Sequence, residues 1–178
     1  AIPREFRAVL RVPADAVETA ERVCRSVGED LAAELGARDP GVAVTTTRTD
    51  APQRYIGPEE TARIVDLLLA MPNGVLGMSR EVPGLVETST NFAAIALRDG
   101  EITILTSQRS SKATMIAAAA ERVAAVIRLA GGTPRFAEWY PAWPPRPESP
   151  LVDTATAVYR KRYGSDPEVG AFHAGLEC

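Results

Sequence analysis

Three residue types that carry out chemistry in proteins lie together in the last seven residues of this chain: His173, Glu177 and Cys178. His173 is the single histidine among 178 residues. A catalytic zinc ion usually takes three protein ligands drawn from His, Asp, Glu and Cys. This set is a poor supply of ligands. The chain is therefore expected to be either part of a larger metalloenzyme or no metalloenzyme at all.

Three interpretations of this terminal group stay open at this point. The spacing of four between His173 and Glu177 suits one face of a helix, but the intervening Ala-Gly-Leu favours a turn that follows a strand. Both residues could be polar surface residues of a loop. Together with Cys178, they could also contribute to a metal site shared between two chains.

A second group of polar residues lies on two long strand-like runs, Gly84 to Arg98 and Glu101 to Arg109. Asp99-Gly100 between them is a strong signal for a two-residue hairpin turn. Counted from this turn, Asn91 and Arg109 lie near the same end of the hairpin, almost opposite each other. Because Arg binds carboxylates bidentately, the pair predicts a clamp for an oxyanion and a carboxylate. The alternative is a solvated sheet end with Arg109 in a surface ion pair.

Composition argues against several classes of function. The net charge is -3 and 46% of residues are hydrophobic; without a basic stripe, nucleic acid is not expected as a partner. No run of about 18 apolar residues exists that could span a membrane. Two cysteines, Cys24 and Cys178, do not make a disulfide framework, so the cytoplasm is the expected compartment. Cys24 lies on the apolar stripe of a helix, where a small buried hydrophobic residue is expected rather than a reactive thiol. Phosphate-loop, Cys-x-x-Cys, His-Glu-x-x-His and nucleophile-elbow motifs are absent from the sequence.

Hydrophobic periodicity predicts both helices and strands. Helices are expected at 17–35, 58–71, 111–130 and 149–163, the first with Asp15 as N-cap and the third with Ser110 or Ser111. Strands are expected at 6–12, 42–49, 84–98, 101–109, 133–139 and 169–172.

This order of elements is typical of an α+β fold, a ferredoxin-like antiparallel sheet with helices on one face. The helix at 58–71 is an insertion that this layout does not explain. Five prolines between 141 and 150 predict a stiff, extended segment and a domain boundary. We therefore expect a first domain at 1–140 and a partial second domain at 141–178, whose single helix and strand need further sequence to bury a core.

Several stretches of this sequence resemble the aminoacyl-histidine dipeptidases, also called Xaa-His or cytosolic non-specific dipeptidases, which are two-zinc metallopeptidases. The stretches occur in family order along the whole chain, and the last is the most specific. They are Ala1-Ile2-Pro3-Arg4-Glu5, Pro72-Asn73-Gly74-Val75, Gly84 to Asn91, Arg109-Ser110-Ser111, Tyr140-Pro141-Ala142-Trp143, Ser149-Pro150-Leu151 and His173 to Cys178.

The resemblance implies a catalytic domain interrupted by an inserted lid domain that also dimerises. Residues 1–140 would be that lid, and 141–178 a helix–strand fragment of the α/β catalytic domain. The family's zinc ligands and general-base Glu would lie mostly before the lid, and the last His ligand after residue 178. Two zinc ions are thus expected in the parent enzyme and none in this chain.

The family's site residues carry over onto matching positions. Asn91 resembles the lid Asn that contacts the substrate and helps to stabilise the tetrahedral intermediate. Arg109 resembles the lid Arg that holds the dipeptide carboxylate. His173 lies in a loop that borders the substrate in relatives, and Glu177 is assigned to substrate binding with it. Gln108 departs from the family, where an apolar residue usually precedes the Arg, and this puts the presentation of Arg109 in question.

Two functions from different classes follow. One is the lid and dimerisation part of a cytoplasmic, homodimeric zinc dipeptidase that acts on small Xaa-His dipeptides, inactive as an isolated chain. The other is a stand-alone, non-catalytic ferredoxin-like module for dimerisation or small-ligand binding. Composition fits both. The set formed by Asn91, Arg109 and the residues from His173 to Cys178 favours the dipeptidase, because a plain dimerisation module has no need of it.

Overall fold

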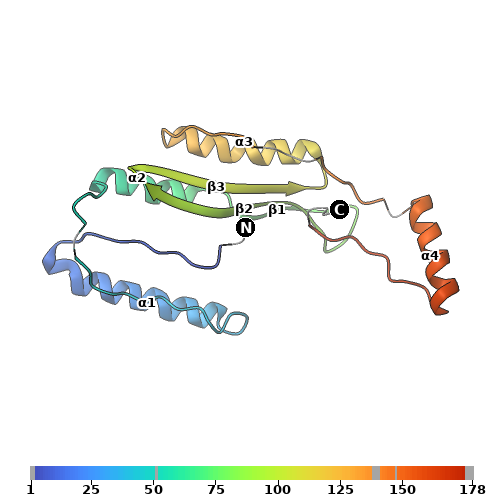
Figure 1. Cartoon of the computed structure of the whole chain (residues 1–178), viewed down its shortest axis with the longest axis horizontal. Coiled ribbons are helices and arrows are strands. Elements are labelled where there is room, and N and C mark those ends of the chain that lie inside the picture. Colours follow the sequence, from blue (N-terminus) through green and yellow to red (C-terminus); the bar gives the residue numbers. More distant parts are fainter. Residues whose placement is uncertain (1–2, 51, 138–140, 147, 175–178) are drawn as a thin grey trace. The chain divides into compact units, whose positions relative to one another are not determined.

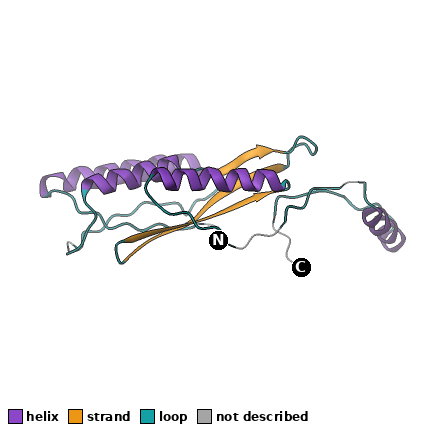
Figure 2. Ribbon diagram, turned by 90° about the horizontal axis from the view of Figure 1, so that it is seen from above, coloured by secondary structure: helices purple, strands orange, loops and turns teal. Residues whose placement is uncertain are grey.

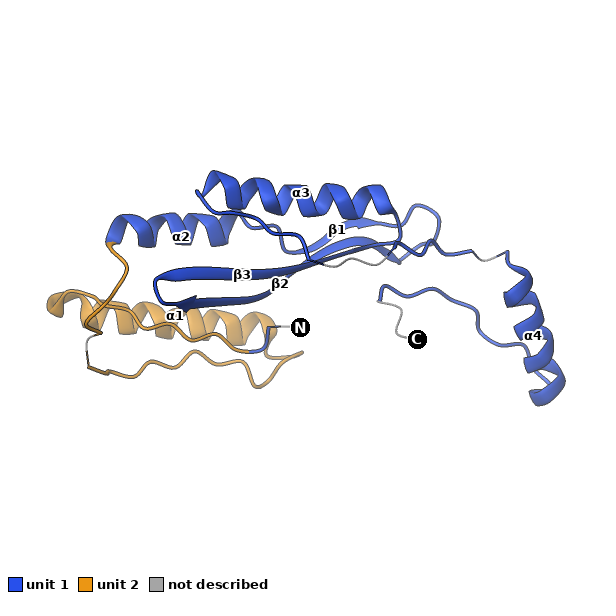
Figure 3. Cartoon of the chain, turned by 45° about the horizontal axis from the view of Figure 1, so that its top comes forward, with its two compact units in different colours: residues 1–4, 58–178 blue, residues 5–57 orange. Residues whose placement is uncertain are grey.

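The computed structural model describes residues 3–50, 52–137, 141–146 and 148–174. The chain forms two compact units, Glu5–Gly57 and a larger one that combines the first four residues with Pro58–Cys178 (Figure 3). The predicted boundary at 140–141 differs from this division at 57–58. It falls next to residues outside the described ranges and stays a prediction.

The unit Glu5–Gly57 is built on one long helix (Figure 1). A 3₁₀ turn, η1 (Ala14–Ala16), leads into α1 (Val17–Leu35), and the Gly36 N–H closes the helix on the Ala32 carbonyl at 2.9 Å. The predicted capping role of Asp15 is wrong. Asp15 lies inside the 3₁₀ turn, and the N-cap is Ala16, which has no side chain that could accept a hydrogen bond.

The predicted strands at 6–12 and 42–49 are extended segments without strand pairing. A strand exists only where a neighbour completes its hydrogen-bond ladder, and no ladder is present among the described residues of this unit. Side chains attach the second segment to α1 instead. Arg48 makes a bidentate ion pair with Glu21, with distances of 2.8 and 3.0 Å. Val44 lies close to Gly28, where an added Cβ would approach it to 3.2 Å.

The larger unit contains a three-stranded antiparallel sheet in the order β1-β2-β3. Its strands are β1 (Gly74–Met78), β2 (Val86–Arg98) and β3 (Glu101–Ser110). The predicted hairpin is confirmed: Asp99 (φ 51°) and Gly100 (φ 85°) both adopt positive φ, as a type I′ turn requires. Strand β1 was not predicted, because two glycines in five residues leave it without an alternating pattern.

Helices cover one face of this sheet (Figure 2). Helix α3 (Ala113–Leu129) packs on β2 and β3, and α2 (Pro58–Ala70) contacts α3. The small side chains of Ala119 and Ala124 allow α3 to approach the sheet closely. The predicted α+β class, an antiparallel sheet with helices on one face, is confirmed. The buried apolar residues of this core are Met71, Ala93, Ala119, Val123 and Ala124.

Two further expectations for this unit are wrong. Helix α3 begins after Lys112, which makes no side-chain cap; Ser110 instead accepts a hydrogen bond from the Lys112 N–H at 3.1 Å, just before the helix. Residues 133–137, the described part of the predicted strand 133–139, are not in a strand. No neighbouring strand completes a ladder beside them within the described sheet.

The final helix, α4 (Pro150–Tyr163), follows the proline-rich segment as predicted. It ends at Gly164, whose φ of 74° gives the left-handed C-cap that glycine favours. Arg160 pairs with Asp166 just beyond the helix. The predicted strand at 169–172 is absent, since these residues have no ladder partner. No helix in the described part of the chain is long and apolar enough to cross a membrane.

Candidate substrate-binding site on the open face of the sheet

The face of the β2–β3 hairpin opposite α3 carries most of the predicted site residues. We call this face the open face and the face that packs on α3 the covered face. On the covered face, Thr88 and Thr90 are only 0% and 2% exposed. The alternation of side chains along a strand then puts the intervening residues on the other side. The open face consists of Ser89, Asn91, Ala94, Leu105, Ser107 and Arg109.

A β-bulge decides which residues reach this face. From the turn the pairing runs in regular register to Ala94, which faces Leu105; the register then shifts, so that Phe92 faces Thr106. Ala93 is the extra residue, and it is buried. An uninterrupted ladder would have paired Asn91 with Gln108 and turned Asn91 toward α3. The bulge instead pairs Asn91 with Ser107 on the open face.

Asn91 and Arg109 therefore share one face, as the predicted clamp requires, although they do not face each other directly. Arg109 pairs with Ser89, which precedes Asn91 by two residues on β2. The expectation that the two are almost opposite is thus corrected by this offset. Arg109 is exposed and Asn91 is half-buried. An amide and a guanidinium are consequently presented on the same face, at diagonal positions on neighbouring strands.

The bulge is held from the β1 side by Asn73. The Asn73 Oδ1 atom accepts a hydrogen bond from the Phe92 N–H at 2.8 Å. Asn73 immediately precedes β1, whose first residue Gly74 has a φ of 92°. The Asn73 side chain thus accepts a hydrogen bond from β2 one residue before β1 begins to pair with β2 through its backbone. This contact lies directly beside the residue whose face the bulge determines.

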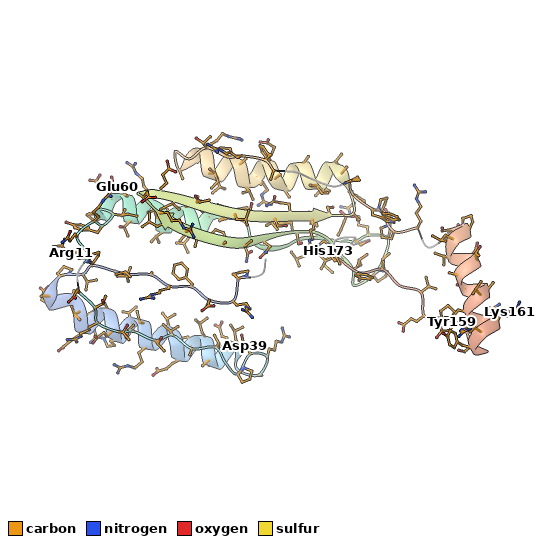
Figure 4. All side chains as sticks on the ribbon, viewed as in Figure 1. Arg11, Asp39, Glu60, Tyr159, Lys161 and His173 are labelled. Carbon is orange, nitrogen blue, oxygen red and sulfur yellow. The ribbon has the colours of Figure 1, made fainter. Side chains whose placement is uncertain are left out.

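His173 reaches the same face from the segment that follows α4. Its Nε2 atom lies 2.7 Å from the Oγ of Ser89. Figure 4 shows His173 beside the strands of the sheet. Since Ser89 is the cross-strand partner of Arg109, the three side chains come from β2, β3 and the C-terminal segment. Residues separated by up to 84 positions in the sequence thus meet at one place.

The electrostatics of this group favour a neutral imidazole. Burial lowers the pKa of His173 below its ordinary value of 6.5, and the nearby positive charge of Arg109 lowers it further. A hydrogen bond with the backbone of Val86 acts in the opposite direction, but it is the weakest of the three influences. At neutral pH the ring therefore has one nitrogen free of a proton to accept the Ser89 hydroxyl hydrogen.

Gln108, the departure from the family pattern, lies on the covered face. Its Nε2 donates to the hydroxyl oxygens of Thr90 and Thr106, both at 3.0 Å. Beside it, the hydroxyls of Thr88 and Ser110 are 2.9 Å apart. The bond from Gln108 to Thr90 and the pair formed by Thr88 and Ser110 link β2 to β3 on the side of the sheet opposite the site. The amide of Gln108 is thus occupied within the sheet, while Arg109 points to the other side.

An ion pair lies at the end of the hairpin that leads into α3. The Lys112 ammonium lies 3.0 Å from the Glu87 carboxylate and 3.7 Å from that of Glu81. Hydrogen bonding and charge at Glu87 raise the pKa of Lys112. This pair joins the start of β2 to the start of α3.

Sequence reasoning missed Ser89, and with it the contact that brings His173 to the sheet. No local pattern announces such a contact, because a serine in a strand with polar neighbours has no special spacing. Glu177 and Cys178, the other members of the predicted terminal group, lie outside the described residues. Cys24 is half-buried on α1.

The described residues also bear on metal binding. Within 3–50, 52–137, 141–146 and 148–174, no three His, Cys, Asp or Glu side chains gather as metal ligands would. His173 uses Nε2 for its bond with Ser89, and its charged neighbour is the cation Arg109.

Comparison with known proteins finds similarity to two dipeptidases. All of the chain aligns, over 182 residues at 29% identity, with cytosol non-specific dipeptidase of Escherichia coli (strain K12). The chain is homologous to this dipeptidase. The crystal structure of aminoacylhistidine dipeptidase from Vibrio alginolyticus matches 93% of the chain with a TM-score of 0.83 and 28% identity. No family model matches the chain.

The resemblance inferred from the sequence motifs is thereby confirmed. The match covers only part of each dipeptidase: the chain spans 37% of the Escherichia coli protein and 34% of the Vibrio alginolyticus chain. Homology to dipeptidases supports a relationship to peptidases, which are hydrolases.

Proposed function

We propose that this chain is the lid and dimerisation part of a zinc-dependent dipeptidase that hydrolyses small dipeptides of the Xaa-His type. The homology along the whole chain supports the reaction class. The observation that carries the proposal is the shared face of Asn91 and Arg109, with His173 bonded beside them. A guanidinium, an amide and an imidazole on one open surface suit a small ligand with a carboxylate and a carbonyl oxygen.

Each side chain then has a defined task. Arg109 binds the C-terminal carboxylate of the dipeptide, because its planar group can donate two parallel hydrogen bonds. Asn91 donates to the oxygen on which negative charge develops as the peptide bond is attacked. His173 borders the substrate beside Arg109, and Glu177 remains a predicted neighbour. Together these residues orient the dipeptide and limit its movement, which lowers the entropic part of the barrier.

The proposal assigns two zinc ions to the rest of the parent enzyme. When bound, zinc polarises the scissile carbonyl and activates water for attack. The task that the proposal gives to this chain is to bind and orient the dipeptide. We accordingly expect the isolated chain to leave dipeptides intact.

Dimerisation and location belong to the same proposal. Within the described sheet β3 is an edge strand of ten residues without proline, and such edges readily pair with another chain. This supports a homodimer formed through the lid. The cytoplasm is the proposed compartment, in keeping with the name of the Escherichia coli homologue. A dipeptide is the proposed partner, and nucleic acid and membranes are not.

The deciding experiment measures hydrolysis by the full-length protein of a Xaa-His dipeptide and of the same dipeptide with an amidated C-terminus. The free acid should be cleaved much faster, because only its carboxylate can pair with Arg109. Arg109→Ala should lower kcat/KM for the acid by roughly 100-fold, about 3 kcal/mol, and remove the preference for acid over amide.

Arg98→Ala is the matched control. Arg98 pairs with Glu101 beside the turn, at the far end of the same hairpin, so its loss should leave both substrates unaffected. If the full-length protein cleaves no dipeptide, the proposal fails and the non-catalytic module takes its place. If it cleaves dipeptides but Arg109→Ala behaves like Arg98→Ala, the residue assignment alone fails.

A further inference from the structure

Ser89 lies at the centre of the candidate site, but it has no task in the proposed binding of a dipeptide. It belongs to β2, the central strand, and its backbone pairs with Val75 of β1 on one side and with Arg109 of β3 on the other. A residue paired on both sides has a fixed backbone position. Its side chain can therefore serve as a fixed point for groups that lie on less regular segments.

The segment after α4 is one of these less regular segments. From Gly164 to Ala174 the chain forms neither helix nor strand. Among the residues that the structure describes, the ring of His173 provides the hydrogen bonds that join this segment to the sheet, through Ser89 and the Val86 backbone. The distance of 2.7 Å between the Ser89 Oγ and the His173 Nε2 is that of a well-formed bond.

The direction of this bond follows from the charges nearby. Burial disfavours a protonated, positively charged imidazole, and the nearby positive charge of Arg109 disfavours it further. A neutral imidazole that bonds through Nε2 to a hydroxyl can act there as the acceptor, with its proton on Nδ1. Ser89 then donates to Nε2, and this bond, together with the bond between the ring and the Val86 backbone, favours one tautomer of the ring.

We propose that Ser89 is a positioning residue: its hydroxyl donates to the Nε2 of His173, sets the tautomer of the imidazole and holds the segment 165–174 on the open face beside Arg109. The value of this arrangement for a dipeptide rests on the proposed function. The hydrogen bond between Ser89 and His173, and its effect on the imidazole, do not depend on the proposed function. Ser89 is not assigned as a nucleophile, because its position in the middle of a paired strand lacks the sharp turn that exposes such a serine.

The test uses the 178-residue chain, in which His173 is the single histidine. With ¹⁵N-labelled histidine, the two ring nitrogens report directly which of them carries the proton. The wild-type chain should show the Nδ1–H tautomer at pH 8. Ser89→Ala should shift the ring toward the Nε2–H tautomer that free histidine prefers, and Ser89→Thr, which keeps a hydroxyl, should retain the wild-type signals.

Ser107→Ala is the matched control, because Ser107 lies on the same open face but pairs with Asn91 and not with Arg109. It should leave the ring signals unchanged. A second readout is chymotryptic cleavage after Phe172, the exposed neighbour of His173. Loss of one hydrogen bond should speed this cleavage roughly two- to tenfold in Ser89→Ala and not in Ser107→Ala.

His173→Ala provides the same test without changing the sheet, should Ser89→Ala fold poorly; it should also accelerate cleavage after Phe172. Wild-type tautomer signals in Ser89→Ala, or wild-type cleavage in His173→Ala, would overturn the inference. These readouts do not involve dipeptides. If the full-length protein cleaves no dipeptide but Ser89→Ala changes the tautomer of His173 as expected, the proposed function is refuted and this inference stays in place.

Discussion

Asn91 and Arg109 lie on the same face of the hairpin because Ala93 bulges out of β2 between Asn91 and the turn. A strand that slips by one residue turns every side chain to the opposite face. Without the bulge, Arg109 would remain on the open face while Asn91 turned toward α3. One extra residue therefore brings an amide and a guanidinium to a common surface, and the groups that hold this bulge contribute to the site without touching it.

The first prediction concerns catalysis by Asn91 in the full-length protein. Asn91→Ala should lower kcat more than it raises KM, because a donor aimed at developing charge acts mainly in the transition state. The expected loss in kcat/KM is about 3 kcal/mol, comparable to that of other single donors of this kind. Steady-state kinetics on a Xaa-His dipeptide measure both constants. An increase in KM alone would show that Asn91 only binds the ground state.

The second prediction concerns Asn73 and the bulge. Asn73→Ala removes the acceptor of the Phe92 N–H. Because the bond is accessible to water, the free energy of unfolding should fall by only about 1 kcal/mol. Asn73→Asp, which keeps an acceptor oxygen, should lose less. Urea unfolding gives the stability, and amide hydrogen exchange at Phe92 should be faster in Asn73→Ala than in the wild type. Equal exchange rates in both would show that Asn73 does not hold the bulge.

How far the sequence alone could predict this structure depends on the range of each interaction. Helices α1, α2, α3 and α4 follow from helical periodicity, and the turn follows from Asp99-Gly100; both signals are local. The segments at 6–12 and 42–49 have the composition of strands, but a strand also needs a partner, which composition does not specify.

The site was predictable in part for the same reason. The residue types alone indicate the chemistry available to Asn91, Arg109 and His173. The bulge at Ala93 has no marker, since neither glycine nor proline stands there and the flanking residues, Phe92 and Ala94, are apolar like Ala93 itself. The bond from Ser89 to His173 joins residues 84 positions apart, and no local pattern encodes it.

The third prediction concerns the buried hydroxyl pair. Thr88→Val keeps the shape of a fully buried side chain but removes its bond to the Ser110 hydroxyl. The free energy of unfolding should fall by about 1 kcal/mol. The control is Thr103→Val, since Thr103 is exposed on β3 and should tolerate the change or gain slightly from a β-branched apolar residue. If both variants lose the same stability, the hydroxyl pair is not the cause.

The last prediction is the pH dependence of stability. The pKa of His173 is lowered in the folded chain relative to the ordinary 6.5, so folding favours the neutral ring. The stabilisation that accompanies neutral His173 is fully present above the ordinary pKa and is lost as the pH falls through the folded pKa. Protonation of the unfolded chain then drives unfolding. Because no other histidine is present, the range from pH 7.5 to 5 reports mainly on this ring.

Urea unfolding of the wild-type chain should accordingly show a lower free energy of unfolding at pH 5 than at pH 7.5. His173→Gln keeps a hydrogen-bonding side chain that does not titrate, and its stability should vary much less over this range. Arg109→Leu separates the two causes of the shift: without the guanidinium the pKa of His173 should rise toward its ordinary value, and the pH dependence should weaken but not disappear, since burial remains the larger influence. A pH dependence in His173→Gln equal to that of the wild type would assign the effect to carboxylates instead and remove His173 from the explanation.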